Sequence, residues 1–340
     1  MKSPPLITAI VVTLNHLNLL RNCLDSLHKQ DYEAMEVIVV DNGSEEDVRG
    51  LLSRAYPETR MIRLDRNYGF AEANNRGIEM AQGKYIALIN NDAVAQPQWI
   101  SSMVATAEAD PTAAAIASII IDGNRPNVLD SCGVGIGLDG MSRQAMRGKA
   151  IPNLDKPKEV LLFSGCACLL RKGALEQVGL FDKDFFAYCE DTDLGLRLQR
   201  AGWSCVVAPN ARVYHHYSMT GGKYSLQKIY WVERNHFWVA VKNYPWFLLV
   251  LLPTLTAYRY LAQVNSLLKH HGELQMYRRN HSLPAIAGAY LKAFWQTVVK
   301  LPAMFNKRRE FKRKGRISGL EFLRLLWKFR LPVKDIIDDR

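Results

Sequence analysis

Short apolar runs alternate with amphipathic segments over the first 120 residues, and this alternation restricts the fold more than any other feature. The apolar runs, rich in β-branched side chains, are residues 7–13, 36–40, 60–64 and 84–89. Between them, residues 17–27 and 71–82 carry apolar side chains at helical spacing. Strands that alternate with helices at this spacing predict an α/β fold built on a mostly parallel, doubly wound sheet.

Polar residues follow the ends of four of these runs. They are Thr13, Asn15, Asp41, Asn67, Gly69, Asn90, Asn91 and Asp92. One such residue is what a turn requires, but in parallel sheets ligands bind beyond the carboxyl ends of the strands. Four polar strand ends in succession therefore favour a shared nucleotide pocket. No G-x-G-x-x-G follows the first run and no Walker-type lysine loop is present, which argues against a dinucleotide-dependent dehydrogenase and a P-loop enzyme.

A dense group of carboxylates lies past the middle of the chain. Glu190, Asp191 and Asp193 fall within four residues, after an aromatic run at 185–188 and before a helical pattern that ends near Gly202. Like charges this close repel one another, so a substrate or a cation is expected to use or neutralise them. The alternative is that Asp191 and Asp193 only cap the helix and complement its dipole. These residues alone leave both interpretations open.

The positive charge is concentrated near the end of the chain. The formal net charge is +11, and residues 307–316 (KRREFKRKGR) hold seven basic side chains and one acidic one. Such a run suits anionic lipid or nucleic-acid phosphate, and a solvated basic tail is the alternative. No nucleic-acid-reading module is recognisable, so we expect no nucleic-acid partner.

The six cysteines predict a reduced, cytoplasmic protein. They form no CxxC pair, have no histidine at zinc-finger spacing, and lie mostly in apolar surroundings. The apolar run at residues 6–14 follows one lysine and two prolines, and no small-residue cleavage site comes after it. We therefore expect a buried strand there rather than a signal peptide.

Several segments, in a fixed order, resemble a known enzyme family. They are IVVTLNHLNLLRNCLDSL, EVIVVDNGSEED, NYGFAEANNRGI, KYIALINNDAVAQP, the stretch from Phe163 to Trp203, and ARVYHHYSMTGGKYS with YWVERN. Together they span about residues 5–240. The chain is similar to family 2 glycosyltransferases of the GT-A fold, in the branch that includes rhamnosyltransferases of bacterial surface polysaccharides. The resemblance implies a Rossmann-like catalytic domain at 1–240 and a helical, basic and amphipathic region at 241–340.

The resemblance also implies a site for a nucleotide-diphosphate sugar. Asp41 would lie beside the nucleobase, and Asp92 would bind a divalent cation, Mn or Mg, with His215 as a second ligand. Many relatives carry Asp-x-Asp where this chain has Asn-Asn-Asp, so Asp92 is the anionic ligand available there. His216 is the alternative histidine, and strand alternation should turn it to the opposite side. The other expected donor contacts are Thr13, Asn15, Asn67, Gly69, Asn74, Asn91 and Arg234, with a phosphate-binding loop at Ser218, Thr220, Gly221 and Gly222.

Asp191 is the expected general base, because it can accept the proton of an attacking hydroxyl. Glu190 and Asp193 would tune it, or Asp193 would serve only the start of the helix. Direct displacement inverts the anomeric centre, as the resemblance also implies. The expected donor is dTDP-rhamnose or a UDP-sugar, and the expected acceptor is a saccharide or lipid-linked saccharide of a cell-surface polysaccharide. The alternative is a catalytically inert nucleotide-sugar-binding or membrane-associated interaction protein, because the metal triplet is reduced to Asp92.

The last hundred residues follow a different pattern. Residues 246–260 are apolar but interrupted by Pro253, and they are too few for a membrane span of about 20 residues. Residues 286–305 are apolar with interspersed lysines, and leucines with basic flanks follow near residue 323. This pattern suits helices that lie in a membrane interface. With relatives that act on lipid-linked acceptors, the resemblance implies a peripheral position on the inner face of the bacterial plasma membrane. The alternative is a helical subdomain that packs on the catalytic domain or on a second copy of the chain.

Overall fold

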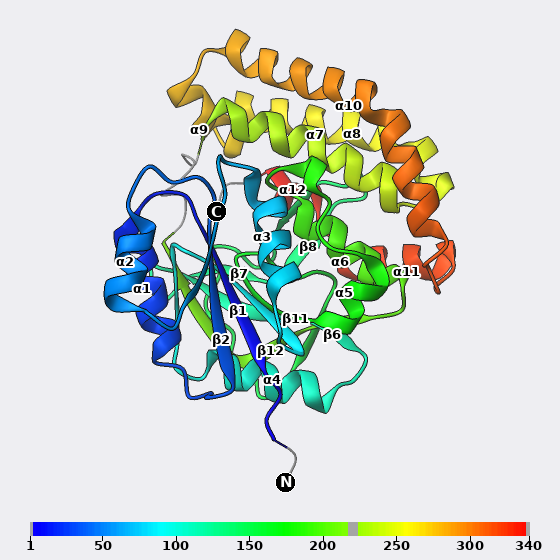
Figure 1. Ribbon diagram of the computed structural model, residues 1–340. Coiled ribbons are helices and arrows are strands. Elements are labelled where there is room, and N and C mark those ends of the chain that lie inside the picture. Colours follow the sequence, from blue (N-terminus) through cyan, green and yellow to red (C-terminus); the bar gives the residue numbers. More distant parts are fainter. Residues whose placement is uncertain (1–2, 217–223, 338–340) are drawn as a thin grey trace.

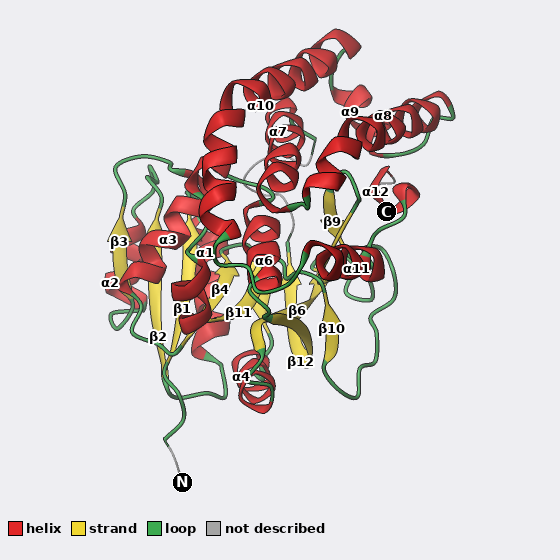
Figure 2. Cartoon of the chain, turned by 90° about the vertical axis from the view of Figure 1, so that its right-hand side faces the viewer, coloured by secondary structure: helices red, strands yellow, loops and turns green. Residues whose placement is uncertain are grey.

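The computed structural model describes residues 3–216 and 224–337. A mixed β-sheet carries helices on both faces, and the C-terminal helices lie above the end at which the parallel strands finish (Figures 1 and 2). The strands are β1 Ile7–Thr13, β2 Met35–Asp41, β3 Arg60–Arg63, β4 Tyr85–Asn90, β5 Ala93–Ala95, β6 Ala113–Asp122, β7 Leu129–Cys132, β8 Val134–Ile136, β9 Ser142–Gln144, β10 Lys158–Val160, β11 Ala167–Arg171 and β12 Ser204–His215.

The helices fall into two groups. Those of the sheet layer are α1 Leu17–His28, α2 Val48–Ala55, α3 Gly69–Met80, α4 Trp99–Ala109, α5 Lys172–Val178 and α6 Glu190–Arg200, with a short 3-10 turn, η1, at Lys183–Phe185. Those of the C-terminal layer are α7 Leu226–Asn243, α8 Trp246–Leu268, α9 Glu273–Asn280, α10 Leu283–Lys312, α11 Gly319–Phe329 and α12 Val333–Ile337.

The sheet confirms the expected α/β architecture. Its strand order is β10-β12-β6-β11-β4-β1-β2-β3, with β5 also paired to β12 and β7 to β6. The half formed by β4, β1, β2 and β3 is wholly parallel, as the alternation of strands and helices requires. Beyond it, β11 is antiparallel to both β4 and β6, whereas β12 is parallel to β6. The four apolar runs of the sequence correspond to β1, β2, β3 and β4.

Two hydrophobic cores explain why these strands are apolar along their whole length. Along β1, Ile7, Ala9 and Val11 face a core shared with α1, α2 and α4, whereas Ile10 faces a core shared with α3, α5 and α6. A strand covered by helices on both faces has no solvent side, so its sequence shows no polar alternation.

A third core joins the C-terminal layer to the sheet layer. Leu196 of α6 and Trp238 of α7 are buried in the same cluster as Leu248 of α8, Met304 of α10 and Phe322 of α11. These helices therefore pack on the sheet layer, in agreement with the alternative of a helical subdomain that packs on the rest of the chain. The division of the chain at residue 240 stays a prediction.

Two expectations about the C-terminal layer are corrected. The helix α8 continues through Pro253 to Leu268 and is 23 residues long, so the apolar run does not stop at residue 260. The basic cluster is not wholly solvated, because Lys307 donates hydrogen bonds to Asp182 and Asp184, and Arg308 donates to the carbonyl of Val241. The other five basic residues of the cluster are exposed.

Candidate active site

One cavity of about 490 Å³ opens where the parallel strands end, beneath the C-terminal layer. Most of its walls come from segments far apart in the sequence. The sheet layer contributes the loops after β2 and β4, the start of α3, the loop before β11, the start of α6 and the end of β12. The C-terminal layer contributes Lys228 and Trp231 of α7, Glu273 of α9, and Leu331 and Asp335 near the end of the chain. Both layers therefore build the cavity.

Asp92 and His215 meet on the wall of this cavity. Asp92 follows β4, and His215 ends β12, the neighbour of β5. Nε2 of His215 lies 3.3 Å from Oδ1 of Asp92, and both side chains are buried. His216 is not among the cavity-lining residues and lies against Gly123, which agrees with the expected alternation.

A third residue, Asp130 of β7, orients His215. Nδ1 of His215 lies 2.8 Å from Oδ2 of Asp130, whose other oxygen contacts Nε of Arg147 at 3.3 Å. Burial opposes ionisation of Asp130, but the hydrogen bond from His215 and the charge of Arg147 keep its pKa below the usual value. A carboxylate that holds Nδ1–H leaves Nε2 as the acceptor on the opposite side of the ring. Sequence reasoning missed Asp130 because it lies in a short strand with no recognisable motif.

The Asp92–His215 pair fits a divalent cation that has further ligands. Oδ1 of Asp92 is buried and accepts no hydrogen bond from a described residue, although it faces Nε2 of His215. Burial opposes protonation of His215, yet Cys166, Asp130 and Asp92 raise its pKa well above the usual value, so the position favours a positive charge, which a bound cation would supply in place of the proton on Nε2. In residues 3–216 and 224–337, no three His, Cys, Asp or Glu side chains gather as a metal site. The protein would thus supply two ligands, and a substrate diphosphate would supply others.

Glu190 and Asp191 begin α6 and both line the cavity, but their environments differ. Oδ2 of Asp191 accepts from the amide of Gly165 at 3.0 Å, and Oδ1 accepts from the amide of Thr192 at 2.7 Å. Burial raises the pKa of Asp191, and these hydrogen bonds oppose the rise. Burial and the charge of Asp191 raise the pKa of Glu190 well above its usual value, and Oε2 of Glu190 accepts no hydrogen bond from a described residue. Ionisation is therefore more favourable at Asp191 than at Glu190.

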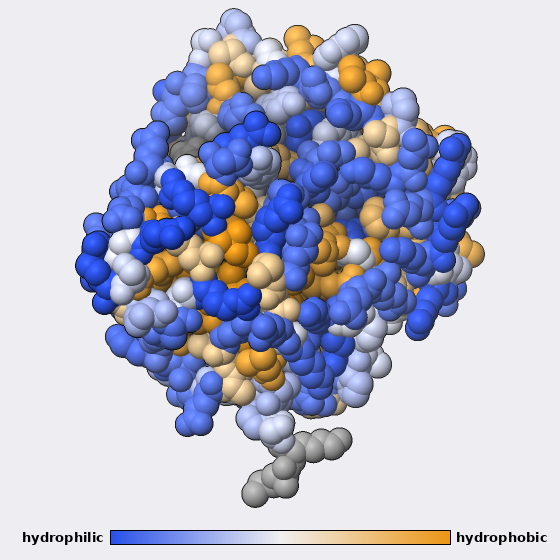
Figure 3. All heavy atoms as spheres, in the orientation of Figure 1, coloured by the Kyte–Doolittle hydropathy of each residue, from blue (hydrophilic) through white to orange (hydrophobic). Residues whose placement is uncertain are grey.

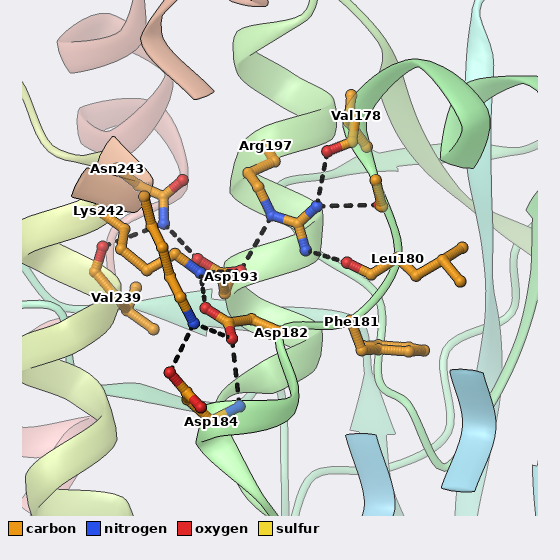
Figure 4. Close-up of polar contacts among 12 residues, drawn as sticks. Val178, Leu180, Phe181, Asp182, Asp184, Asp193, Arg197, Val239, Lys242 and Asn243 are labelled. Atoms are coloured by element: carbon orange, nitrogen blue, oxygen red, sulfur yellow. Dashed lines mark hydrogen bonds and ion pairs between the residues drawn. The ribbon is translucent and has the colours of Figure 1, made fainter. Parts of the chain in front are cut away.

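Asp193 lies behind the cavity wall in a buried network of charges (Figure 4). It accepts from Nε of Arg197 at 3.0 Å, Nζ of Lys242 at 2.8 Å and Nδ2 of Asn243 at 2.9 Å. Lys242 also donates to Asp182 at 2.6 Å, and Lys307 of α10 donates to the second oxygen of Asp182 at 2.5 Å. Asp193 therefore anchors α6 to α7 and, through Asp182, to α10. It does not line the cavity.

The expected site residues divide into two groups. Those that line the cavity are Asn67, Gly69, Asn91, Asp92, Glu190, Asp191 and His215. Thr13, Asn15, Asp41, Asn74 and Arg234 are not among the lining residues. The expected loop of Ser218, Thr220, Gly221 and Gly222 lies outside the described residues.

The second group has other partners in the fold. Thr13 accepts a hydrogen bond from the side chain of Asn91 at 3.0 Å, and the side chain of Asn15 accepts from the amide of Glu45 at 2.8 Å. Asn74 is buried within α3 and donates to the carbonyl of Phe70 at 2.9 Å. All three residues thus have hydrogen-bond partners within the fold, and their direct contact with a donor stays a prediction.

Asp41 and Arg234 are also held by the protein. Asp41 is fully buried, forms an ion pair with Arg63, and accepts from the amide of Ser44 at 2.8 Å. Its neighbour Asn42 lines the cavity in its place. The guanidinium of Arg234 donates to the carbonyl of Phe185 at 2.8 Å and packs on the ring of Trp238. It also donates to the side chains of Asn235 and Tyr230, so its hydrogen-bond partners lie within the protein, and its contact with a diphosphate stays a prediction.

The cavity also contains residues that sequence reasoning did not select. The segment around β9 provides Arg143, Arg147 and Lys149, and Arg143 forms an ion pair with Glu273 of α9. Phe186 and Tyr188 line it beside Trp231 of α7. The aromatic run at 185–188 was a visible signal for the first two. Nothing in the local sequence links Glu273 to Arg143, 130 residues earlier.

Comparison with known proteins identifies the family. The model of the family described as "Glycosyl transferase family 2" matches residues 8–179. The uncharacterised protein y4gI of Sinorhizobium fredii is 31% identical over 65% of this chain, which spans only 26% of that relative's length. An N-acetylglucosaminyl-diphospho-decaprenol L-rhamnosyltransferase of Mycobacterium tuberculosis is 30% identical, over 60% of this chain and 74% of the relative.

A solved structure extends the likeness to the fold of nearly the whole chain. Mannosyltransferase PcManGT from Pyrobaculum calidifontis, in complex with GDP-Man and Mn²⁺, covers 95% of this chain and 88% of its own, at 18% identity and a TM-score of 0.52. At this identity the likeness concerns the fold alone, which is that of a GT-A glycosyltransferase. With half of the sequence matched by the family model, the chain belongs to glycosyl transferase family 2.

Proposed function

We propose that this glycosyltransferase moves a sugar, with inversion, from a nucleotide-diphosphate donor to a saccharide or lipid-linked saccharide acceptor. One observation carries the proposal: Asp191, Asp92 and His215, from three distant elements, line one cavity at the carboxyl ends of the parallel strands. The relative from Mycobacterium tuberculosis is a rhamnosyltransferase, and its name specifies a sugar linked to a lipid diphosphate as the acceptor. We therefore favour dTDP-rhamnose or a UDP-sugar as donor, for the synthesis of a cell-surface polysaccharide.

In the proposed reaction, Asp191 takes the proton of the acceptor hydroxyl while its oxygen attacks the anomeric carbon. The bond from that carbon to the diphosphate oxygen breaks, and the nucleoside diphosphate leaves with the electron pair. Attack from the side opposite the leaving group inverts the centre. Asp92 and His215 would hold a Mn or Mg ion, which stabilises the charge that develops on the diphosphate. Asn67, Gly69 and Asn91 would contact the donor, because they line the same cavity.

The substitution Asp191→Asn tests the role of the base. We expect loss of sugar transfer, because an amide cannot accept the proton, and retention of donor binding. Nucleotide release in the presence of acceptor measures transfer, and the thermal shift caused by the nucleotide sugar measures donor binding. Glu176→Gln, at an exposed position of α5, is the matched control. Normal turnover by Asp191→Asn would contradict the assignment.

The alternative is a catalytically inert nucleotide-sugar-binding or membrane-associated interaction protein. It draws support from the single aspartate in the Asn-Asn-Asp triplet. A thermal shift with UDP- or dTDP-sugars, without nucleotide release on addition of any acceptor and Mn²⁺, would favour it over the enzyme.

We also infer that the protein attaches peripherally to the cytoplasmic face of a bacterial plasma membrane. Among the described residues, α8 is the helix that is long and apolar enough to cross a membrane by length and composition. Its charged residue, Arg259, is buried against Asp139 at 2.5 Å and Glu233 at 3.0 Å, so its inner face is bound to the protein. An interfacial position is then favoured over a span. The exposed large apolar residues of α8 are Trp246, Phe247, Val250, Leu251, Tyr258, Leu261, Val264 and Leu268.

Apolar side chains also appear at the surface over α10 along the upper edge of the molecule (Figure 3). We expect sedimentation with phosphatidylglycerol vesicles at low salt, and release at high salt because the basic residues near 309–316 are screened. Leu261→Glu should weaken vesicle binding, whereas Leu6→Glu, near the opposite end of the molecule, should not. Complete recovery of the wild type in the supernatant at low salt would refute attachment. A concentration-dependent dimer without vesicles would instead support pairing of two copies through these helices.

A further inference from the structure

The segment that leads into Glu190 and Asp191 has an unusual backbone. Phe186, Tyr188 and Cys189 have φ angles of 65°, 69° and 66°, so three non-glycine residues within four positions have a positive φ, which L-residues rarely adopt. Such conformations are sterically unfavourable for residues with a Cβ atom, and they persist where the surrounding structure enforces them. All three residues line the cavity. The strain is therefore located at the candidate active site.

Asn235 of α7 holds this strained segment. Its fully buried Nδ2 lies within hydrogen-bond distance of the carbonyls of Phe185, Ala187 and Tyr188, at 3.0, 2.9 and 2.7 Å. Nε of Arg234 donates to Oδ1 of Asn235 at 2.9 Å, which fixes the orientation of the amide. The side-chain amide of Asn235 thus contacts three backbone carbonyls, which would point in different directions in an extended or helical segment.

The start of α3 holds the same segment from its other side. The carbonyl of Phe186 accepts from the amide of Ala71 at 3.2 Å. Gly69 has a φ of 81°, and a Cβ atom there would come within 2.4 Å of that carbonyl oxygen. The close approach of the two backbones therefore requires glycine at this position.

The result is an aromatic surface beside the two carboxyl groups. The rings of Phe186 and Trp231 are stacked, with centroids 5.0 Å apart and an interplanar angle of 27°. The ring of Tyr188 is tilted against Trp231 at 6.2 Å. These three side chains, which we call the aromatic shelf, are half-buried and line the cavity. A pyranose ring presents polarised C–H groups on its less polar face, and the electron-rich face of an aromatic ring attracts them.

We propose that the aromatic shelf is the acceptor subsite, where it binds the C–H face of a pyranose and directs one hydroxyl group toward Asp191. Asn235 is then a positioning residue, because it fixes the backbone that displays Phe186 and Tyr188. The inference rests on the proposed function and deepens it: the acceptor unit next to the transferred sugar is itself a pyranose. In the chain, only Cys189 separates Tyr188 from Glu190 and Asp191. The Asp92–His215 pair comes from other elements, the loop after β4 and the end of β12.

Replacement of Trp231 tests the shelf. The probe is a panel of water-soluble octyl hexosides and octyl N-acetylhexosaminides, from which the best acceptor of the wild-type protein is used. We expect Trp231→Ala to raise the acceptor KM roughly tenfold, by analogy with the loss of one stacked ring, and Trp231→Phe to retain most of the affinity. The donor KM and the thermal shift with the nucleotide sugar should not change. Trp327→Ala, at an exposed position of α11, is the matched control.

Asn235→Ala provides a second test. We expect a higher acceptor KM and a lower kcat with an unchanged donor KM, a pattern that a general loss of folded protein would not produce. Trp231→Ala with a normal acceptor KM would overturn the proposal. A weakened donor thermal shift in that variant would also overturn it, by assigning the shelf to the nucleobase. Absence of transfer by the wild type to every glycoside would contradict the proposed function itself, and the shelf with it.

Discussion

The substitution Lys242→Met should destabilise the protein strongly and in a pH-dependent manner. Lys242 is fully buried in α7 and donates to Asp182 and Asp193, whose side chains are 7% and 0% exposed (Figure 4). Methionine has a similar length and packs in an apolar environment, so the change removes the charge with little loss of volume. The buried carboxylates of Asp182 and Asp193 would therefore lose the ammonium group that they share.

Removal of one partner from a buried ion pair typically costs about 3–5 kcal/mol. Arg197 still contacts Asp193, and Lys307 still contacts Asp182, so we expect the lower part of that range. For a chain of 340 residues, the entropy of unfolding near 60 °C is about 0.7 kcal/mol/K. A loss of about 3 kcal/mol then lowers Tm by about 4 °C. Lys300→Met, at an exposed position of α10, is the control and should leave Tm nearly unchanged.

The pH dependence follows from the two carboxylates. Burial opposes ionisation of Asp182, but Lys242 and Lys307 keep its pKa well below the usual value. Lys242 and Arg197 likewise lower the pKa of Asp193 against the effect of burial. A lowered pKa gives stability that is present above the pKa of the unfolded chain and is lost as the pH falls. In Lys242→Met both carboxyls are easier to protonate, so its deficit in Tm should shrink between pH 7 and about pH 4. Thermal unfolding followed by circular dichroism measures this. A deficit that is constant with pH, or no larger than that of the control, would refute the reasoning.

Three further predictions follow from the site. Because burial raises the pKa of Asp191 and the base must be ionised, kcat/KM should fall with decreasing pH around a midpoint above about 4; a midpoint at or below 4 would contradict this. Asp130→Ala should weaken Mn²⁺ binding about 10–100-fold, measured by calorimetry with nucleotide present, because His215 loses its orienting partner; unchanged affinity would exclude that role. Gly69→Ala should lower the free energy of unfolding by about 1–3 kcal/mol, measured by thermal unfolding. Gly173→Ala, whose Cβ would meet nothing within 4 Å, should not destabilise the protein. Equal effects of the two substitutions would contradict the close approach at Gly69.

The C-terminal layer shows where local sequence is insufficient. Pro253 suggested an interruption, but the helix continues through it to Leu268, since Leu248, Leu252 and Thr256 pack against the rest of the chain on both sides of the proline. Tertiary packing of this kind outweighs the local cost of one proline. For the basic cluster, a solvated tail was one of the interpretations that the sequence left open. Lys307 instead enters a buried network because Asp182, 125 residues earlier, lies beside it.

The sequence by itself determined the α/β architecture, the four parallel strands and the family, because these depend on the periodicity of apolar residues and on short motifs. It also identified several cavity-lining residues at the carboxyl ends of strands, such as Asn91, Asp92 and His215. Only the tertiary structure decided that Asp130 orients His215, that Asp193 faces Lys242 rather than the cavity, and that Asn235 holds the strained turn. The physical reason is that these roles depend on contacts between residues 47 to 85 positions apart in the chain. No local pattern in the chain encodes such distances.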